Sequence, residues 1–104
     1  MDFIELNFRQ AKRQAAQLEN LAVRLERLAR NDFNGTLQNI ASSWKGESAD
    51  AYLQKGGRLE DNIARTADDL RRTAQTIRST AQRTYNAEMR ARELARERMY
   101  GGGN

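Results

Sequence analysis

The fold of this 104-residue chain is decided by the stretch Ile40-Ala41-Ser42-Ser43-Trp44-Lys45-Gly46-Glu47-Ser48-Ala49-Asp50-Ala51-Tyr52. Its tripeptide Trp44-Lys45-Gly46 stands near the middle of the chain, between two long segments in which apolar residues recur at helical spacing. Gly46 permits a tight backbone, and Ser43 is a candidate N-terminal cap for the helix that follows. We therefore predict a bend over residues 43–47 that joins two helices.

The segment before the bend keeps a heptad rhythm from residue 4 to residue 29. Its apolar residues follow one another at alternating steps of four and three. They form two rows that lie on one face of a helix. A third row, Leu21 and Leu28, flanks these two towards the bend. A face three rows wide is typical of a helix that contacts two others, as in a bundle. The first two rows are Ile4, Ala11, Leu18 and Leu25, and Phe8, Ala15, Ala22 and Ala29.

The heptad phase changes at the stretch Asn31-Asp32-Phe33-Asn34-Gly35. Beyond Ala29 the apolar residues follow at steps of four, four, three and four, which amounts to a stutter. Asn34-Gly35 is in addition a turn signal. We predict a first helix over about residues 4–42, with a kink or a short interruption near residues 31–36. The apolar residues after the phase change are Phe33, Leu37, Ile40 and Trp44.

The segment after the bend predicts a second helix over about residues 47–99. Small residues are frequent on its core face and allow helices to approach closely, and Gly56-Gly57 is either a weak point or a close crossing. We expect ion pairs at a spacing of four residues to support the helix, namely Asp61–Arg65, Asp68–Arg72 and Glu88–Arg92. We expect residues 101–104 to form a disordered tail. The predicted core face is Ala49, Tyr52 or Leu53, Gly56, Leu59, Ile63, Ala67, Leu70, Ala74, Ile77, Ala81 and Tyr85.

These patterns predict one all-α domain over residues 1–100, an antiparallel two-helix hairpin. Such a hairpin is only two helices wide, so one side of its apolar seam stays exposed. Pairing of two hairpins into a four-helix bundle would cover that side. The residues expected in the helix seam and the dimer interface are Phe8, Leu18, Leu21, Leu25, Leu28, Leu37, Ile40, Leu59, Ile63, Leu70 and Ile77.

The composition argues against an enzyme, because the chain has no His, no Cys and no glycine-rich phosphate loop. The adjacent acids Glu60-Asp61 and Asp68-Asp69 are expected on exposed helix faces, where neighbouring side chains point about 100° apart and form no carboxylate dyad. We therefore expect no cofactor and no metal site. The sequence also contains no apolar run long enough to span a membrane and no recognisable signal peptide.

The net charge of +4 is concentrated at one end of the chain. Residues 1–70 carry 10 Lys/Arg and 11 Asp/Glu, whereas residues 71–104 carry 8 Arg and 3 Glu. The basic segment is either a solvated helix face or a surface for an acidic partner. A basic coiled-coil protein that binds nucleic acid or an anionic surface is a further alternative. The scarcity of aromatic residues for base stacking in that segment, apart from Tyr85 and Tyr100, argues against nucleic acid.

The stretch around the bend, together with the chain length and the flanking heptads, resembles the WXG-100 family of ESAT-6-like proteins. The resemblance covers nearly the whole chain in architecture and is residue-specific mainly over 37–59. It implies a helical hairpin that dimerises into a four-helix bundle. It also implies a small non-enzymatic substrate or partner protein of a type VII secretion system, mostly found in Gram-positive bacteria. Such proteins are made in the cytoplasm and reach the cell surface or the medium without a signal peptide.

The resemblance further implies a composite export signal that a membrane-bound secretion ATPase engages. Its first element is the Trp-x-Gly bend of one subunit, which Trp44 and Gly46 match. Its second element is a C-terminal Tyr-x-x-x-Asp/Glu motif of the other subunit. Here Tyr85 is followed by Glu88 at the third position and by Met89 at the fourth. Glu88 is therefore either a variant of that element or an ordinary partner of Arg92.

Two roles remain open within the family. The chain is either a self-sufficient homodimer or the dedicated heterodimeric partner of a larger secreted toxin with a helical domain of the same type. The segment from Glu88 to Arg98 favours the second role, since it reads as a helix that extends past the bundle and could bind another helix.

Overall fold

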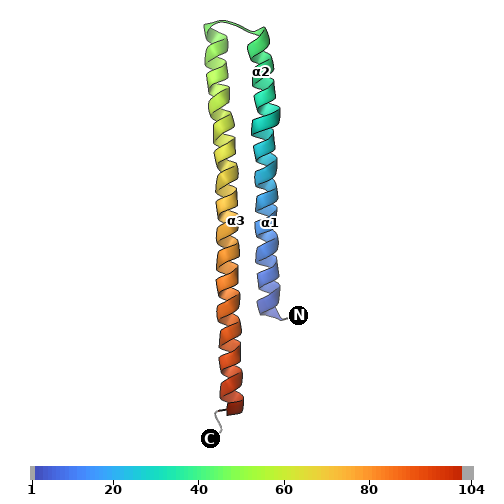
Figure 1. Cartoon of the computed structure of the whole chain (residues 1–104), viewed down its shortest axis with the longest axis vertical. Coiled ribbons are helices and arrows are strands. Elements are labelled where there is room, and N and C mark those ends of the chain that lie inside the picture. The colour runs from blue at the N-terminus through green and yellow to red at the C-terminus, as the bar shows by residue number, and fades with distance from the viewer. Residues whose placement is uncertain (1, 102–104) are drawn as a thin grey trace.

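The computed structural model describes residues 2–101, and all of its helices lie in one antiparallel hairpin (Figure 1). The first arm consists of α1 (Phe3–Arg27), the π-helical segment η1 (Leu28–Phe33) and α2 (Asn34–Ser43). The second arm is the single helix α3 (Glu47–Gly101). The prediction of an all-α helical hairpin is confirmed. The predicted disordered tail lies outside the described residues, apart from Gly101, which ends α3.

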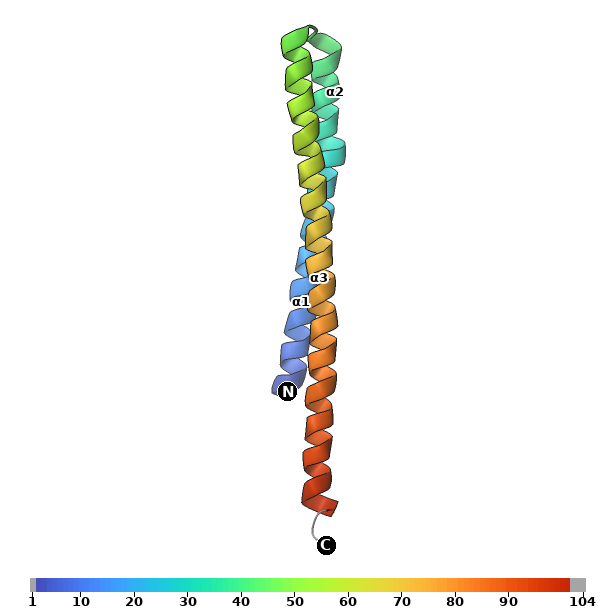
Figure 2. The same ribbon diagram turned by 90° about the vertical axis from the view of Figure 1, so that its left-hand side faces the viewer.

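The two arms form a thin rod with extents of 88 × 20 × 11 Å. Turned by 90° about the long axis, the two arms overlap along the rod and cross each other at a shallow angle (Figure 2). The arms differ in length, and α3 runs on past the start of α1 (Figure 1). Arg92 on α3 contacts Asp2 at the start of α1, so the last turns of α3 have no α1 residue beside them.

The first arm is continuous through the predicted kink. Asn34 donates its backbone N–H to the carbonyl of Ala29, which is the i→i+5 bond of a π-turn. In a regular α-helix, the eight steps from Ala29 to Leu37 would rotate the side-chain direction by two full turns and about 80° more. A π-turn accommodates one extra residue, which reduces this rotation by roughly 100°. The π-turn therefore returns Leu37 to the face of Ala29, and both residues are buried. The stutter is absorbed without an interruption, and Asn34-Gly35 is helical.

The core of the hairpin is a line of small side chains. No large side chain is completely buried among the described residues, and Leu37 is the largest apolar residue classed as buried. Small residues let the two arms approach closely, but they leave little apolar area to hold the arms together. The larger seam residues Leu18, Leu25, Ile63, Leu70 and Ile77 are only partly covered. The buried apolar residues are Ala15, Ala22, Ala29, Leu37, Ala49, Ala67 and Ala74.

Candidate functional site: the bend and the two flanks of the hairpin

The bend is formed by three residues between α2 and α3. Trp44 has an extended backbone, and its N–H still donates to the carbonyl of Ile40 at 2.9 Å. Gly46 has a φ of 117°, a conformation that side chains rarely allow, and a β-carbon there would meet nothing within 4 Å. Glycine is thus required by the backbone angle and not by lack of space.

The polar side chains at the bend donate hydrogen bonds to backbone carbonyls of α2. The hydroxyl of Ser43 donates to the carbonyl of Asn39 at 3.2 Å, and the ammonium group of Lys45 donates to the carbonyl of Ala41 at 2.6 Å. The prediction of Ser43 as the N-cap of the second helix is therefore wrong. Ser43 is the last residue of α2, since the extended backbone of Trp44 separates it from α3.

The indole of Trp44 forms an exposed aromatic pair with Tyr52 from the second turn of α3. The ring centroids are 5.7 Å apart at an interplanar angle of 53°. Both side chains remain about half exposed. The pair gives the tip of the hairpin a small exposed aromatic surface.

Tyr85 and Glu88 lie far from the bend within one chain. Tyr85 stacks on Phe8 with ring centroids 4.6 Å apart, and the ammonium group of Lys12 lies 4.5 Å from the centre of the Phe8 ring. Tyr85 and Glu88 line one apolar groove together with Phe8. Tyr85 comes 38 positions after Glu47, the first residue of α3, which corresponds to roughly 57 Å of helix. A single chain therefore does not bring Tyr85 to Trp44.

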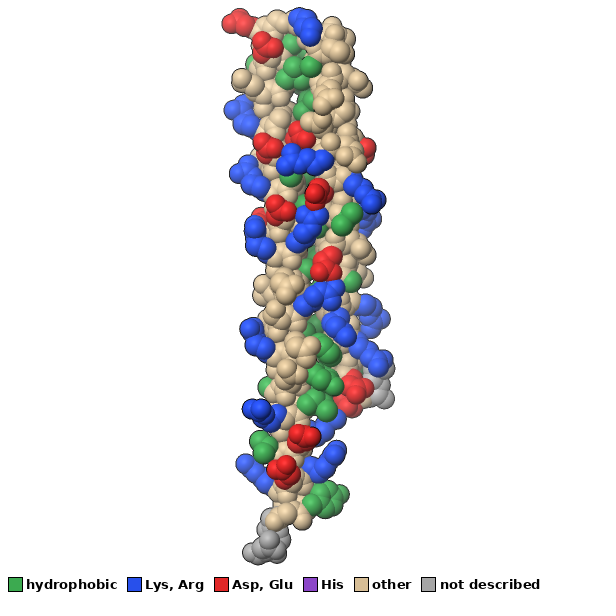
Figure 3. All heavy atoms as spheres, viewed as in Figure 1, with side chains coloured by type: hydrophobic (Ala, Val, Ile, Leu, Met, Phe, Trp, Pro, Cys, Tyr) green, Lys and Arg blue, Asp and Glu red, His purple; other side chains and the backbone are tan. Residues whose placement is uncertain are grey.

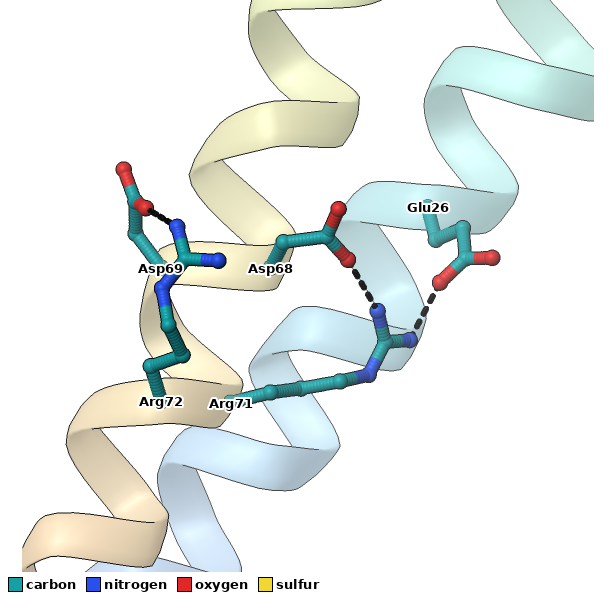
Figure 4. A network of polar contacts seen from close by, with 5 residues as sticks. All are labelled: Glu26, Asp68, Asp69, Arg71 and Arg72. Atoms are coloured by element: carbon teal, nitrogen blue, oxygen red, sulfur yellow. Dashed lines mark hydrogen bonds and ion pairs between the residues drawn. The ribbon is translucent and has the colours of Figure 1, made fainter.

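One side of the hairpin, which we call the charged flank, is crossed by ion pairs between the arms. Arg78 donates to Glu19 at 2.5 and 3.2 Å, and Arg71 binds both Glu26 and Asp68. Figure 3 shows charges of both signs along the boundary between the two arms, and Figure 4 shows Arg71 reaching from α3 to Glu26. These pairs connect the arms and leave this flank polar.

Asp2 closes the open end of the charged flank. Its carboxylate accepts from the backbone N–H groups of Ile4 at 2.8 Å and Glu5 at 3.2 Å, so it caps α1. It also accepts from Arg92 at 3.0 Å. The Arg92 hydrogen bond, followed by the backbone N–H of Glu5, lowers the pKa of Asp2 to about 2.

These contacts correct the expected ion pairs within the second helix. Arg92 binds Asp2 and not Glu88, Arg72 binds Asp69 and not Asp68, and Arg65 donates to Asn62 at 2.5 Å and not to Asp61. For Arg92, the carboxylate of Asp2 on the other arm competes with Glu88 one turn away on the same helix. Arg72 and Arg65 stay within α3 and bind the side chain three residues earlier. Sequence spacing alone does not show that competition.

The prediction that Glu60 lies on an exposed helix face is wrong. Glu60 is only 7% exposed and turns towards the first arm, whereas Leu59, expected in the core face, is 49% exposed. Asn34 donates to Glu60 at 3.2 Å, and Arg30 lies 3.6 Å from its other oxygen. Glu60 lies on the same face of α3 as the buried residues Gly56 and Ala67, so its carboxylate belongs to the seam.

The opposite side, which we call the uncharged flank, carries no Asp, Glu, Lys or Arg in the row nearest the seam on either arm. The partly covered Leu21 and Leu28 lie on it, and so does the expected interface residue Leu59. Two apolar grooves open on this flank, one that includes Asn7 and Thr80 and one that includes Tyr52, Leu59 and Ile40. Its rows are Asn7, Gln14, Leu21 and Leu28 on α1 and η1, and Tyr52, Leu59, Thr66, Thr73, Thr80, Ala87 and Leu94 on α3.

Within residues 2–101 no cluster of three or more His, Cys, Asp or Glu side chains could hold a metal ion. No described helix is long and apolar enough to cross a membrane. The hairpin, its bend at Gly46 and its uncharged flank define a class of small all-α hairpin proteins.

The family follows from comparison with known proteins. Residues 4–89 match the family model WXG100, described as proteins of 100 residues with WXG. The match spans most of the chain, and the chain belongs to this family. No curated protein and no solved structure matches it. Trp44-Lys45-Gly46, which forms the bend, is the motif that gives the family its name.

Proposed function

We propose that this chain is a non-enzymatic component of a bacterial type VII secretion system that acts by dimerising through its uncharged flank. Membership of the WXG100 family supports the secretion role. The composition of the core supports dimerisation. The buried side chains form a line of alanines, and the larger apolar side chains beside them remain partly exposed. A second hairpin on that flank would cover these side chains and complete a four-helix bundle.

The charged flank is the less suitable interface. Its arginines and carboxylates already bind each other, and covering them would remove their hydration without adding partners. The same pairing argues against the nucleic-acid alternative. Arg71, Arg72, Arg78 and Arg92 are engaged with carboxylates, so fewer cations of the basic segment are free to bind phosphates.

The experiment is light scattering over a concentration series with one matched pair of variants. Leu28 lies on the uncharged flank at 46% exposure, and Val23 lines a groove of the charged flank at 41% exposure. We expect the wild type to have the mass of two chains. Leu28→Asp should raise the dissociation constant by roughly a hundredfold or more, since an unpaired buried charge costs about 3 kcal/mol. Val23→Asp should leave it unchanged.

A wild-type dimer that tolerates Leu28→Asp would contradict the uncharged flank as the interface. A chain that is monomeric alone, and dimerises only when a second hairpin protein is added, would favour the heterodimeric partner of a larger secreted toxin. The overhanging end of α3 supports that second role, because Leu94 and Met99 are exposed there without a helix of this chain beside them.

We further propose that the protein is exported by a signal-peptide-independent route through contact with the secretion ATPase. Trp44 and Gly46 would form one element, and Tyr85 with Glu88 would form another. Arg92 binds Asp2, so the expected pair with Arg92 does not engage Glu88. Amounts of protein in the culture medium of the producing bacterium test this, with Trp44→Ala and Glu88→Gln as variants. Arg13→Ala, exposed on α1, is the control, and export of both variants at the control level would contradict the proposal.

A further inference from the structure

The Asn34-Gly35 pair, which reads as a turn signal in the sequence, is held in a helix by the fold. The other internal asparagines of the chain each precede a residue that carries a side chain. An asparagine before glycine is the most prone to deamidation in an unfolded chain, because no β-carbon shields the next backbone nitrogen. The pair therefore has a reactivity that the hairpin does not use.

Deamidation of this pair needs only the chain itself and water. The backbone nitrogen of Gly35 loses its proton and attacks Cγ of the Asn34 side chain. The bond from that nitrogen to Cγ forms, the bond from Cγ to Nδ2 breaks, and ammonia leaves, which closes a succinimide ring. Water then opens the ring at either carbonyl and gives aspartate or isoaspartate. Overall an amide and a water molecule become a carboxylate and an ammonium ion.

The fold opposes the closure of that ring. Asn34 has a φ of −61° and a ψ of −43°, and the ring closes only after rotation about the Cα–C bond away from this helical value. The side-chain amide is also held at both ends, since Nδ2 donates to Glu60 at 3.2 Å and Oδ1 accepts from Gln38 at 2.8 Å. The reaction therefore requires local opening of the first arm.

Aspartate at position 34 does not suit the seam. It would place a carboxylate within hydrogen-bond distance of the carboxylate of Glu60, which is only 7% exposed. Two carboxylates that share one site oppose each other's ionisation. Arg30 lies 3.6 Å from the other oxygen of Glu60 and is already shared with Asp61 at 3.5 Å. The deamidated side chain would thus replace a donor with a like charge.

Isoaspartate would disturb the same region through the backbone. It inserts a methylene group into the main chain between residue 34 and Gly35, which shifts the residues that follow. Leu37 has little room for such a shift, because it packs against α3 so closely that a β-carbon on Gly56 would stand 2.5 Å from it. Both products therefore weaken the contact between α2 and α3.

From these contacts we infer that Asn34 is a site of self-modification that the folded hairpin protects. While the arms are paired, the residue remains an amide. In an opened chain it becomes aspartate or isoaspartate, and the change is not reversed by refolding. Prolonged unfolding is thereby recorded in the chain and lowers the stability of the protein that refolds.

Mass spectrometry on the full-length chain measures the modification. One sample is kept in buffer at neutral pH and another in guanidinium chloride at the same pH and temperature. The tryptic peptide of residues 31–45 carries Asn34 together with Asn31 and Asn39 as internal references. In denaturant we expect conversion of Asn34 to be at least about tenfold faster than that of the references. In the folded chain its conversion should be slower by about tenfold or more.

Gly35→Ala is the matched variant that isolates the chemistry. A β-carbon at position 35 would meet nothing within 4 Å, so the fold is retained. The added methyl group hinders attack by the backbone nitrogen of that residue. We expect conversion of Asn34 in denaturant to fall to the rate of Asn31 and Asn39, and circular dichroism confirms that the variant folds.

Asn34→Asp reproduces one product and tests its effect on the fold by urea unfolding. It should lower the ratio of folded to unfolded chain by about tenfold or more, because a carboxylate replaces the donor to Glu60. Glu60→Gln in that background should recover most of the loss, since an amide at position 60 donates to the new carboxylate. Asn20→Asp, the same charge change at an exposed position of α1, should alter the ratio by less than about threefold.

Three results would overturn the inference. Equal conversion of Asn34 in the folded and the denatured chain would contradict protection by the fold. Conversion in denaturant no faster than that of Asn31 and Asn39 would contradict the modification site itself. An Asn34→Asp variant as stable as Asn20→Asp would contradict the effect on the seam.

Discussion

Gly56 on α3 lies so close to Leu37 on α2 that a β-carbon at position 56 would stand 2.5 Å from Cδ2 of Leu37. The neighbouring Gly57 has nothing within 4 Å of the same position. Both glycines are helical, and each costs the helix roughly 1 kcal/mol against alanine. The difference between them is therefore a difference in packing and not in helix propensity.

The first prediction compares alanine at these two positions. Gly57→Ala should stabilise the protein by about 0.5–1 kcal/mol, because it improves helix propensity without a clash. Gly56→Ala should be less stable than Gly57→Ala by about 1–3 kcal/mol, the usual cost of overpacking. Thermal unfolding followed by circular dichroism measures both. Equal stability of the two variants would mean that Leu37 moves aside without cost.

The second prediction concerns the bend. Gly46→Ala should destabilise the hairpin by about 1–3 kcal/mol, because its positive φ strains any side chain even where space is free. Gly35→Ala in α2, also without a neighbour within 4 Å, is the matched control and should stabilise by up to about 1 kcal/mol. Urea unfolding gives both values. A Gly46→Ala variant as stable as the wild type would show that the backbone relaxes to a negative φ.

The third prediction uses the lowered pKa of Asp2, which falls from 3.8 to about 2 in the folded chain. Because the folded-state pKa is below the unfolded one, the ionised carboxylate stabilises the fold fully above about pH 4, and that contribution is lost as the pH falls towards 2. Asn still caps a helix, so Asp2→Asn removes the charge and keeps the cap. Its melting temperature should lie below that of the wild type at pH 7.

The comparison must be made as a function of pH. The difference in melting temperature between wild type and Asp2→Asn should shrink steadily between pH 4 and pH 2. In the background of Arg92→Gln, the substitution at Asp2 should have a smaller effect at pH 7, since the main cause of the lowered pKa is gone. A difference that stays constant down to pH 2 would contradict the contact between Asp2 and Arg92.

The fourth prediction concerns the buried carboxylate of Glu60. Asn34→Ala removes its closest hydrogen-bond donor and should destabilise the protein by about 1–3 kcal/mol. The double variant Asn34→Ala with Glu60→Leu should recover most of that loss, because an apolar side chain needs no donor in the seam. Gln17→Ala, an exposed control on α1, should change stability by less than about 0.5 kcal/mol. Urea unfolding of all three variants is the measurement. Failure of the double variant to recover would indicate a separate role for Asn34 in the π-turn.

Local spacing in the sequence was sufficient to predict the helical hairpin. Apolar residues at spacings of three and four required helices, and Trp44-Lys45-Gly46 interrupted them once, where a glycine allows a left-handed backbone. The stutter after Ala29 was also visible, because the loss of heptad phase is a property of spacing. These features depend on residues close together in the chain, whose geometry follows from the helix alone.

The residues that meet across the seam could be identified only from the packing of the two arms. The sequence left open whether the stutter would kink or break the helix, and the need to keep Leu37 beside α3 selected a π-turn. It suggested ion pairs along α3, whereas the nearness of the other arm assigned Arg71 and Arg92 to Glu26 and Asp2. The burial of Glu60 and the division into a charged and an uncharged flank likewise depend on the register of the two arms. That register is set by long-range packing, and no spacing within a single helix encodes it.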